Sequence, residues 1–500
     1  MTIENLQNGS DIRGIAIATD EFEITLTEEI AEQVGRGIVN WLVAEKGLGA
    51  ELVAQKLTIA VGQDSRLSGE MLKAALIKGI RSQGANAVDT GLSTTPAMFK
   101  TTQFPDFNCD AGVMITASHL PYYFNGIKIF SREGGAEHED IAYILSHTEP
   151  NEAAELGHFS GREVLTLYAQ DLVAKIRQGT GLVIDKPLAS FKIIVDAGNG
   201  AAGFFAEKVL VELGANTTGS QFLEPDGHFP NHIPNPDNAE AMASIRQAVL
   251  DNHADLGVIF DTDVDRSAIV DKFGNTLNRN NLIAILAKIV LESEPNATIV
   301  TNSPTSTHLK HFINRLGGKQ VRYLCGYRNV INKAIELNAE GIDTPLAIET
   351  SGHAAFREND FLDDGAYVIA KILMLLPQLK TENREISDLI AEMAQPVETN
   401  EIRFKINLSD YRFYGENVIA TFADFIAKIA DFKTDLDNEE GIRVNFTGNY
   451  GQGWFLLRMS LHEPLLVLQV ENDVSGKNEL VIAKLLEFFA EFSNLTLPNF

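Results

Sequence analysis

A strand, a turn and a second strand follow one another in Gly112-Val-Met-Ile-Thr-Ala-Ser-His-Leu-Pro-Tyr-Tyr-Phe-Asn-Gly-Ile-Lys-Ile-Phe130. The apolar run Val113–Ile115 predicts a buried strand that stops at the polar turn. We therefore expect the hydroxyl of Ser118 to be displayed on a loop between two rigid elements, where reactive groups tend to lie. A serine becomes a nucleophile when a base takes its proton or a cation stabilises its charge, and His119 is adjacent. An ordinary Ser/His turn is the alternative that this segment alone leaves open.

The same strand-then-helix pattern recurs along the chain. Apolar runs at Leu57–Val61, Phe191–Asp196 and Ala297–Asn302 each precede a helix-period segment, which is typical of βαβ units. The last hundred residues differ, because they combine four strand-like runs with helical patterns around Val418–Ile429 and Asn478–Phe492. The chain therefore contains two kinds of domain.

These patterns predict an α/β protein. We expect three related βα-rich, mixed-sheet domains followed by an α+β C-terminal domain. The boundaries fall at residues 1–150, 151–280, 281–395 and 396–500, and each length suits a single hydrophobic core.

Composition excludes several classes of protein. The chain has 500 residues, 45% of them hydrophobic, which is globular, and a net charge of −27 argues against nucleic acid or an anionic membrane as a partner. No apolar stretch approaches the length of a membrane span, and the N-terminal residues lack the features of a signal peptide. Only Cys109 and Cys325 occur, so we expect a cytoplasmic protein without a structural zinc site.

An acidic turn follows the apolar run Leu256–Phe260. Its alternating carboxylates would repel one another unless a cation lies among them, and oxygen ligands suit Mg²⁺ or Ca²⁺; they are Asp261, Asp263 and Asp265. An EF-hand is excluded, because Arg266 occupies its glycine position and Lys272 its glutamate position. Few ligands and open coordination sites favour Mg²⁺ shared with a substrate phosphate. A solvated acidic turn is the alternative.

Two later loops offer polar groups after apolar strands. Glu349, Ser351 and His353 follow Leu346–Ile348 and could hydrogen-bond sugar hydroxyls, although a structural polar loop is equally consistent with the sequence. Arg458 lies on what we interpret as a post-strand loop with Ser460, a suitable phosphate clamp, or else a surface turn. Taken together, the four loops carry the parts that phosphoryl transfer to or from a sugar needs.

With these four loops, the chain resembles the α-D-phosphohexomutase superfamily over nearly its whole length. The family carries a serine loop with a downstream lysine, an acidic metal loop, a sugar loop, a phosphate loop and an N-terminal Asp-Ile-Arg-Gly. The matching residues are Thr116–Pro121 with Asn125–Lys128, Asp261–Arg266, Glu349–His353, Arg458–Pro464 and Asp11–Gly14.

The resemblance implies roles for these residues. Ser118 would be a phosphoserine whose phosphate, with Asp261, Asp263 and Asp265, holds one Mg²⁺. The phosphate would pass to the sugar to give a hexose 1,6-bisphosphate, which reorients and returns the other phosphate to the serine. The resemblance also implies acid/base or charge-stabilising roles for His119 and Lys128, and neutralisation of the phosphoryl group by Arg13 and Arg266. The sugar would be bound by Glu349, Ser351 and His353, and the distal phosphate by Arg458, Ser460 and His462.

This chain departs from the family pattern at several positions. In the phosphate loop Leu461-His462 replaces Gly-Thr, which removes a glycine and a hydroxyl donor, although a protonated His462 could donate instead. Other substitutions are Ser10 for Tyr, Leu120 for Asn, Thr262 and Val264 for metal-loop glycines, and Ile348 for Gly. The nucleophile and metal carboxylates are intact, so we expect phosphoryl transfer to survive while substrate preference shifts.

The expected enzyme is a phosphohexomutase, a phosphotransferase-type isomerase. It would interconvert hexose 1-phosphate and hexose 6-phosphate in a central cleft, with Mg²⁺ and a hexose 1,6-bisphosphate activator, as a monomer or homodimer. The sequence leaves the hexose open among glucose, mannose and glucosamine phosphates. It also leaves open a hexose-1,6-bisphosphate synthase and, in another class, a catalytically inactive sugar-phosphate-binding protein.

Overall fold

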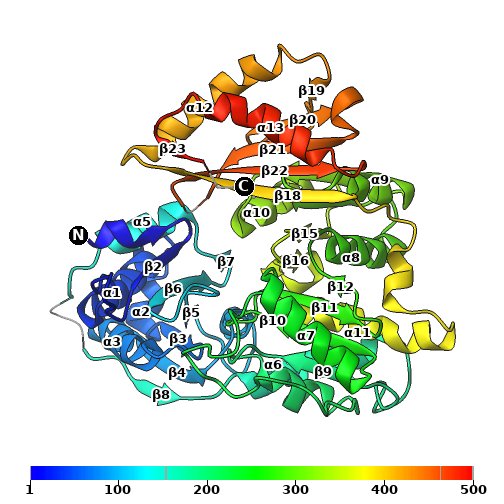
Figure 1. Cartoon of the computed structure of the whole chain (residues 1–500). Helices are drawn as coiled ribbons and strands as arrows, with labels where there is room; N and C mark the ends of the chain where they lie inside the picture. Colours follow the sequence, from blue (N-terminus) through cyan, green and yellow to red (C-terminus); the bar gives the residue numbers. More distant parts are fainter. Residues whose placement is uncertain (1, 152–154, 462, 498–500) are drawn as a thin grey trace. The chain divides into compact units, whose positions relative to one another are not determined.

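The computed structural model describes residues 2–151, 155–461 and 463–497, and their chain order and labels are shown in Figure 1. Two compact units divide the chain. The first unit comprises Met1–Leu282 with Ser351–Asp388, and the second comprises Ile283–Thr350 with Leu389–Phe500. Both combine helices with mixed or antiparallel sheets, so the predicted α/β class is confirmed.

The N-terminal sheet of the first unit is mixed. Its described strands follow the order β1-β2-β6-β5-β3-β4-β8, and β7 pairs with β6. Because β3 is parallel to β5, the carboxyl ends of both strands meet at one edge of the sheet. The strands are β1 (Gln7–Asn8), β2 (Asp11–Ile15), β3 (Thr58–Gln63), β4 (Asn86–Leu92), β5 (Ala111–Ile115), β6 (Phe124–Ser131), β7 (Gly134–Gly135) and β8 (Phe159–Gly161).

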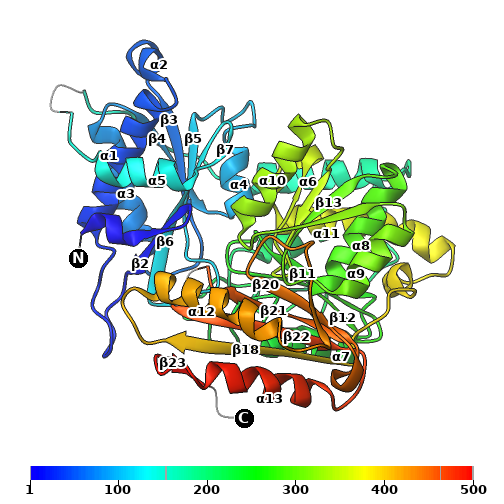
Figure 2. The same cartoon turned by 90° about the horizontal axis from the view of Figure 1, so that it is seen from above.

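Helices α1 (Glu28–Ala44) and α3 (Gly69–Ser82) lie together on one side of this sheet, as both views show (Figures 1 and 2). They cross closely at glycines, since a Cβ added at Gly79 would lie 2.0 Å from the carbonyl oxygen of Glu32. Their apolar faces share one core with the strands. The remaining helices here are 3-10 helix η1 (Ile3–Leu6), α2 (Gly49–Ala54), α4 (Thr95–Lys100) and α5 (His138–Ser146).

A second sheet of the first unit follows the order β12-β11-β10-β9. Strands β10 and β11 are antiparallel neighbours joined by the acidic turn, so the turn is anchored on both sides by buried strands. The helix-period segment that follows the apolar run Phe191–Asp196 contains the π-helix η2 (Phe205–Leu210). The other elements are α6 (Leu165–Gly179), β9 (Ile193–Asp196), α7 (Ala239–Asn252), β10 (Leu256–Phe260), β11 (Ser267–Asp271), β12 (Thr276–Leu277), β16 (Ala354–Phe356), 3-10 helix η3 (Arg357–Asn359), β17 (Leu362–Asp363) and α11 (Gly365–Thr381).

The second unit begins with parallel strands. β13 is parallel to both β14 and β15, with helices between them in the chain, as the βαβ pattern predicts. The elements are α8 (Arg279–Ser293), which continues from the first unit, β13 (Thr298–Asn302), α9 (Thr307–Arg315), β14 (Lys319–Tyr323), α10 (Tyr327–Ala339), β15 (Leu346–Ile348) and 3-10 helix η4 (Ile386–Ile390).

The C-terminal part of the second unit is an antiparallel sheet with the order β19-β20-β21-β22-β18-β23. Helices α12 and α13 lie against this sheet (Figure 1). The core between them is rich in phenylalanine, and the rings of Phe404 and Phe489 stack at 4.2 Å. The elements are β18 (Glu398–Ile406), α12 (Tyr411–Ile426), β19 (Phe432–Thr434), β20 (Ile442–Phe446), 3-10 helix η5 (Gly448–Tyr450), β21 (Gly453–Met459), β22 (Leu465–Asn472), α13 (Asn478–Phe489) and β23 (Leu495–Thr496).

Two further expectations from the sequence concern membrane-spanning helices and the two cysteines. Among the helices of the described residues, none has the length and apolar character that crossing a membrane requires. Cys109 and Cys325 are both free and buried.

Candidate active site

Ser118 lies on the loop between β5 and β6 in the first unit. Its side chain is buried, with 3% of the residue exposed, whereas the sequence suggested a displayed hydroxyl. The burial arises because the turn after β10 covers the loop. The Ser118 hydroxyl donates to Asp261 Oδ2 at 2.9 Å, and Arg266 Nη2 donates to Ser118 Oγ at 2.5 Å. The predicted nucleophile and the predicted metal turn therefore meet directly.

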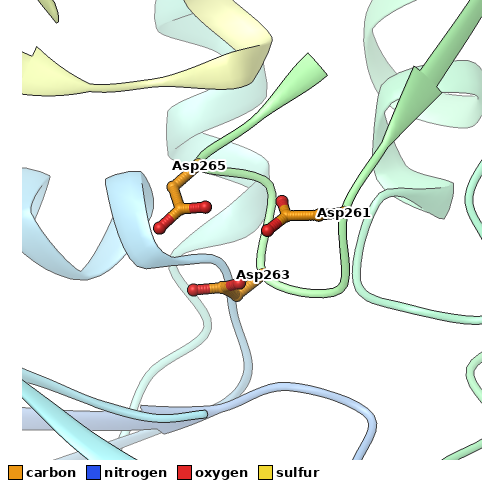
Figure 3. A group of neighbouring side chains, drawn as sticks. All are labelled: Asp261, Asp263 and Asp265. Atoms are coloured by element: carbon orange, nitrogen blue, oxygen red, sulfur yellow. The ribbon is translucent and has the colours of Figure 1, made fainter. Parts of the chain in front are cut away.

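The three carboxylates of that turn gather in one place. Asp261, Asp263 and Asp265 each offer an oxygen, and these oxygens lie within 4.8 Å of one another (Figure 3). All three residues are buried. The alternative of a solvated acidic turn is therefore wrong.

A divalent cation fits this group. Two buried oxygens, Asp263 Oδ1 and Asp265 Oδ1, have no hydrogen-bond partner, and a hard cation prefers such ligands. Burial, reinforced by the charge of Asp265, raises the pKa of Asp261 well above its usual range. A bound cation would offset that penalty and favour the charged carboxylates.

Lys128 reaches the same carboxylates from β6. Its Nζ lies 3.0 Å from Asp263 Oδ2 and is also hydrogen-bonded to Asp265 Oδ2. Burial alone would raise the pKa of Asp265, but Lys128 and then His353 outweigh it and hold that pKa well below its usual range. The lysine therefore partly neutralises the acidic group, as a charge-stabilising role requires.

The two arginines expected at the reacting phosphate differ in position. Arg266 is buried, and its Nε donates to Asp261 Oδ2 at 3.0 Å. Arg13 lies on β2 and pairs with Asp11 at 2.9 Å. Arg266 contacts the serine oxygen itself, so it can stabilise charge on that oxygen when the phosphate leaves.

His119 is a neutral acceptor in this arrangement. Burial, followed by the charges of Arg266 and Arg13, lowers the pKa of His119 well below its usual range. Arg266 Nη2 lies 2.6 Å from His119 Nδ1, so the guanidinium donates to an unprotonated nitrogen. An imidazole in this state can accept a proton but contributes no positive charge.

The second half of the sugar loop lies against the metal turn. Ser351 Oγ is 3.1 Å from His353 Nδ1, and His353 Nε2 is 3.5 Å from Asp265 Oδ1. The backbones of His353 and Arg266 form an isolated antiparallel bridge. Ser351 and His353 therefore belong to the same unit as Ser118.

The remaining predicted residues lie in the second unit. Glu349 Oε1, directly after β15, accepts the backbone N–H of Gly326 at 2.8 Å. Arg458 lies within β21 and not on a post-strand loop, because the strand continues to Met459; its Nη1 donates to the Met459 carbonyl at 3.0 Å. Ser460 follows that strand, and its Oγ accepts from the Glu463 amide at 3.4 Å. The predicted ligand His462 lies outside the described residues.

Sequence reasoning missed three residues at the site. Asp64 and Arg66, in the loop after β3, contact the serine loop, and Thr95 hydrogen-bonds Asp263. The signal that could have found them was their position after parallel strands. Because β3 is parallel to both β4 and β5, polar residues that follow these strands lie at the same edge of the sheet.

Family models match most of the chain. Residues 4–154, 168–274 and 278–397 match the models of phosphoglucomutase/phosphomannomutase alpha/beta/alpha domains I, II and III respectively.

Individual relatives agree over nearly full length. A phosphomannomutase/phosphoglucomutase of Pseudomonas putida is 32% identical over 467 residues, 93% of this chain and 90% of the relative. A phosphoglucomutase of Neisseria gonorrhoeae is 30% identical over 479 residues, 94% of both chains. The crystal structure of a phosphoglucomutase/phosphomannomutase family protein from Burkholderia thailandensis superposes with a TM-score of 0.78 at 25% identity, covering 100% of both chains. This chain therefore belongs to the phosphoglucomutase/phosphomannomutase family.

Proposed function

We propose that this chain interconverts hexose 1-phosphate and hexose 6-phosphate with Ser118 as the phosphate carrier. The observation that carries the proposal is the placement of Ser118 Oγ, which lies 2.9 Å from Asp261 Oδ2 in a group of three carboxylates that fits a metal ion. A serine facing a divalent-metal site suits phosphoryl transfer, which depends mainly on positioning and charge neutralisation. Membership of the family supports the same reaction.

The first transfer moves the phosphoryl group from Ser118 Oγ to a sugar hydroxyl. The O–P bond to the serine breaks, a new O–P bond forms to the sugar, and the sugar proton passes to a base, for which the neutral His119 is the candidate. Lys128, as an ammonium beside Asp263 and Asp265, would stabilise charge. Arg266 donates to the serine oxygen and so stabilises it as a leaving group. The product is a hexose 1,6-bisphosphate, which reorients and returns its other phosphate to the serine.

Magnesium, when bound, would supply charge neutralisation for the transferring phosphoryl group. Asp261, Asp263 and Asp265 would hold one ion together with the Ser118 phosphate, because each offers a carboxylate oxygen within 4.8 Å of the others and two further oxygens, Asp263 Oδ1 and Asp265 Oδ1, have no hydrogen-bond partner. Lys128 and Arg266 hold the same carboxylates in place from the other side of the group. Hexose 1,6-bisphosphate would act as the activator that first phosphorylates the serine.

Substrate binding, in this proposal, involves the residues of the sugar and phosphate loops. Glu349 and Ser351, with His353, would hold the sugar hydroxyls, since carboxylate and hydroxyl groups match vicinal hydroxyls. Arg458, Ser460 and His462 would hold the distal phosphate, and Arg13 would assist at the transferring one. We further propose the four-domain division at residues 150, 280 and 395, a monomer or homodimer, and a cytoplasmic location, which the two free thiols support.

A hexose-1,6-bisphosphate synthase is the second candidate. It is favoured by Leu461, which occupies the usual glycine position of the phosphate loop and approaches Gly326 closely: a Cβ added at Gly326 would lie 3.0 Å from Leu461 Cδ2. A bulky side chain there changes the shape of the proposed clamp. A mutase must hold the distal phosphate in both orientations of the sugar, whereas a synthase holds it in only one, so a reshaped clamp suits a synthase better.

The test is a panel of glucose, mannose and glucosamine 1-phosphates with Mg²⁺, with and without hexose 1,6-bisphosphate. Conversion of at least one to its 6-phosphate is expected, with loss of activity in Ser118→Ala and retention in Ser131→Ala, a buried serine on the neighbouring strand. With a second, non-hexose bisphosphate added as the phosphoryl donor to Ser118, net formation of hexose bisphosphate without isomerisation would identify the synthase. Binding of sugar phosphate with no turnover on the whole panel would identify an inactive binding protein.

A further inference from the structure

The backbone of Ser118 adopts an unusual conformation. Its φ is +52°, in the left-handed region that non-glycine residues seldom occupy because the side chain crowds the backbone. Such a conformation persists only where the surroundings fix it. The groups that hold the two peptide units beside Ser118 therefore determine where its Oγ points.

One of those groups is the guanidinium of Arg66. Its Nη2 donates to the carbonyl oxygens of Ser118 and, at 2.6 Å, Leu120, while its Nη1 donates to those of Pro121 at 2.9 Å and Phe124 at 3.0 Å. A single side chain thus fixes four carbonyl groups along the serine loop. A planar guanidinium is suited to this because its donors are rigidly oriented.

The other peptide unit is held through Asp64. The Thr116 hydroxyl donates to Asp64 Oδ2 at 2.6 Å, and Thr116 Oγ1 then accepts the backbone N–H of Ser118 at 3.0 Å. Asp64 also accepts the backbone N–H of Arg66 at 2.9 Å, and its carboxylate lies 3.4 Å from Arg66 Nε. The same ion pair therefore reaches the peptide groups on both sides of Ser118.

Arg66 is committed to this role by its surroundings. Its side chain is fully buried, and the ring of Phe229 lies 5.2 Å from the guanidinium carbon. Gly227 brings the same loop against the backbone of the Arg66 segment, since an added Cβ there would lie 2.5 Å from the Ser65 carbonyl oxygen. Because both Nη groups of Arg66 already donate hydrogen bonds to carbonyls of the serine loop, the arginine does not serve as a phosphate ligand.

We propose that the Asp64–Arg66 pair, acting through Thr116 and the loop carbonyls, is the positioning device that aims Ser118 Oγ at Asp261 and Arg266. Neither member of the pair contacts the reacting oxygen, so both are positioning residues. The inference rests on the proposed phosphate-carrier function of Ser118. It adds that acceptance of phosphate by Ser118 depends on hydrogen bonds made by Asp64, Arg66 and Thr116, none of which is a proposed metal or substrate ligand.

The test compares Thr116→Val with Thr116→Ser in the full chain. Valine keeps the shape but removes the hydroxyl, so the rate at which hexose 1,6-bisphosphate phosphorylates Ser118 should fall at least about tenfold, with a change in KM below about twofold. Serine restores the hydroxyl and should recover the rate to within about threefold. Arg66→Ala should lose the rate and regain part of it on addition of guanidinium ion, whereas Arg66→Lys should remain impaired.

Amide hydrogen exchange at Ser118 gives a readout that does not depend on catalysis. Protection should be lost in Thr116→Val and kept in Thr116→Ser. Unchanged phosphorylation and protection in Thr116→Val, or no recovery in Thr116→Ser, would overturn the inference, even if Arg66→Ala fails to fold. Absence of phosphorylation in the wild type would count against the proposed function alone. In that case the hydrogen-exchange comparison of Thr116→Val with Thr116→Ser still decides whether the Thr116 hydroxyl holds the serine loop.

Discussion

Ser118 and Asp261 are 143 residues apart in sequence and are joined by a hydrogen bond of 2.9 Å between the serine hydroxyl and the carboxylate. The bond unites a loop of the N-terminal sheet with the turn between β10 and β11. It places the candidate phosphate carrier directly at the candidate metal ligands. The predictions below test this shared site and the scaffold that supports it.

The first prediction concerns the metal ligands. Asp263→Asn and Asp265→Asn each remove one charged ligand with little change in size, so the affinity for Mg²⁺ should fall at least about tenfold and turnover should fall with it. Titration of each variant with Mg²⁺ gives the affinity, and Asp251→Asn, an exposed residue of α7, is the control. Equal affinities in all four proteins would remove these carboxylates from the metal site.

Lys128 gives a prediction in which binding and turnover change in opposite directions. Its Nζ lies 3.0 Å from Asp263 Oδ2, so the ammonium competes with a cation for the carboxylates. Lys128→Met should therefore tighten Mg²⁺ binding about tenfold while lowering kcat by at least about tenfold. The control is Lys78→Met, whose ion pair with Glu32 is on the surface. A variant that binds Mg²⁺ more weakly than the wild type would contradict the competition.

Asp64 predicts a pH dependence of stability. Burial raises the pKa of Asp64 from 3.8 to about 6, although Arg66 and Thr116 oppose the shift. Between these values the folded chain keeps a proton that the unfolded chain has lost. The contribution of the protonated group is therefore complete below about pH 4 and is lost as pH rises through about 6.

The measurement is the urea midpoint of wild type relative to Asp64→Asn, which should decline between pH 4 and pH 7. Asp185→Asn, an exposed carboxyl of the same unit, should show no such trend relative to the wild type. A difference that is constant with pH, or one that increases, would refute the raised pKa.

Arg443 tests the scaffold of the second unit. Its buried guanidinium lies 3.6 Å from the Trp454 ring centroid and donates to the carbonyls of Ser303 and Thr305. Removing it in Arg443→Met leaves the two carbonyls without this donor, while Asp435 keeps Arg322 at 3.5 Å, so we expect a destabilisation of about 1–3 kcal/mol.

Thermal and urea unfolding measure that loss, with Arg403→Met as the exposed control on β18. Phosphorylation of Ser118 should persist in folded Arg443→Met, because the groups around the serine belong to the first unit. Similar unfolding of the two variants would show that the buried arginine contributes no more than a surface one.

Local patterns predicted much of the fold. The alternation of apolar runs with polar turns located β5, β6 and the β10–β11 turn. Helix α12 begins at Tyr411, seven residues before the predicted Val418, although Tyr411 and Tyr414 in its first turns pack against the core.

Long-range contacts account for what the sequence did not predict at the site. Ser118 is buried by Asp261 and Arg266, which lie 143 and 148 residues away, so no local pattern could reveal its burial. The clamp by Arg66 has the same origin, since its carbonyl partners become neighbours only once β3 and β5 pair. The sequence motifs identified the candidate reacting residues, but only the tertiary structure shows which residues hold them in position.

The most direct test of the phosphate-carrier role is the intact mass of the purified chain after incubation with hexose 1,6-bisphosphate and Mg²⁺. The wild type should gain one phosphate group per chain and lose it again to added hexose monophosphate. Ser118→Ala should gain none, while Ser131→Ala should behave as the wild type. A wild type that stays unmodified, or a Ser118→Ala variant that still gains the phosphate, would contradict the assignment of Ser118.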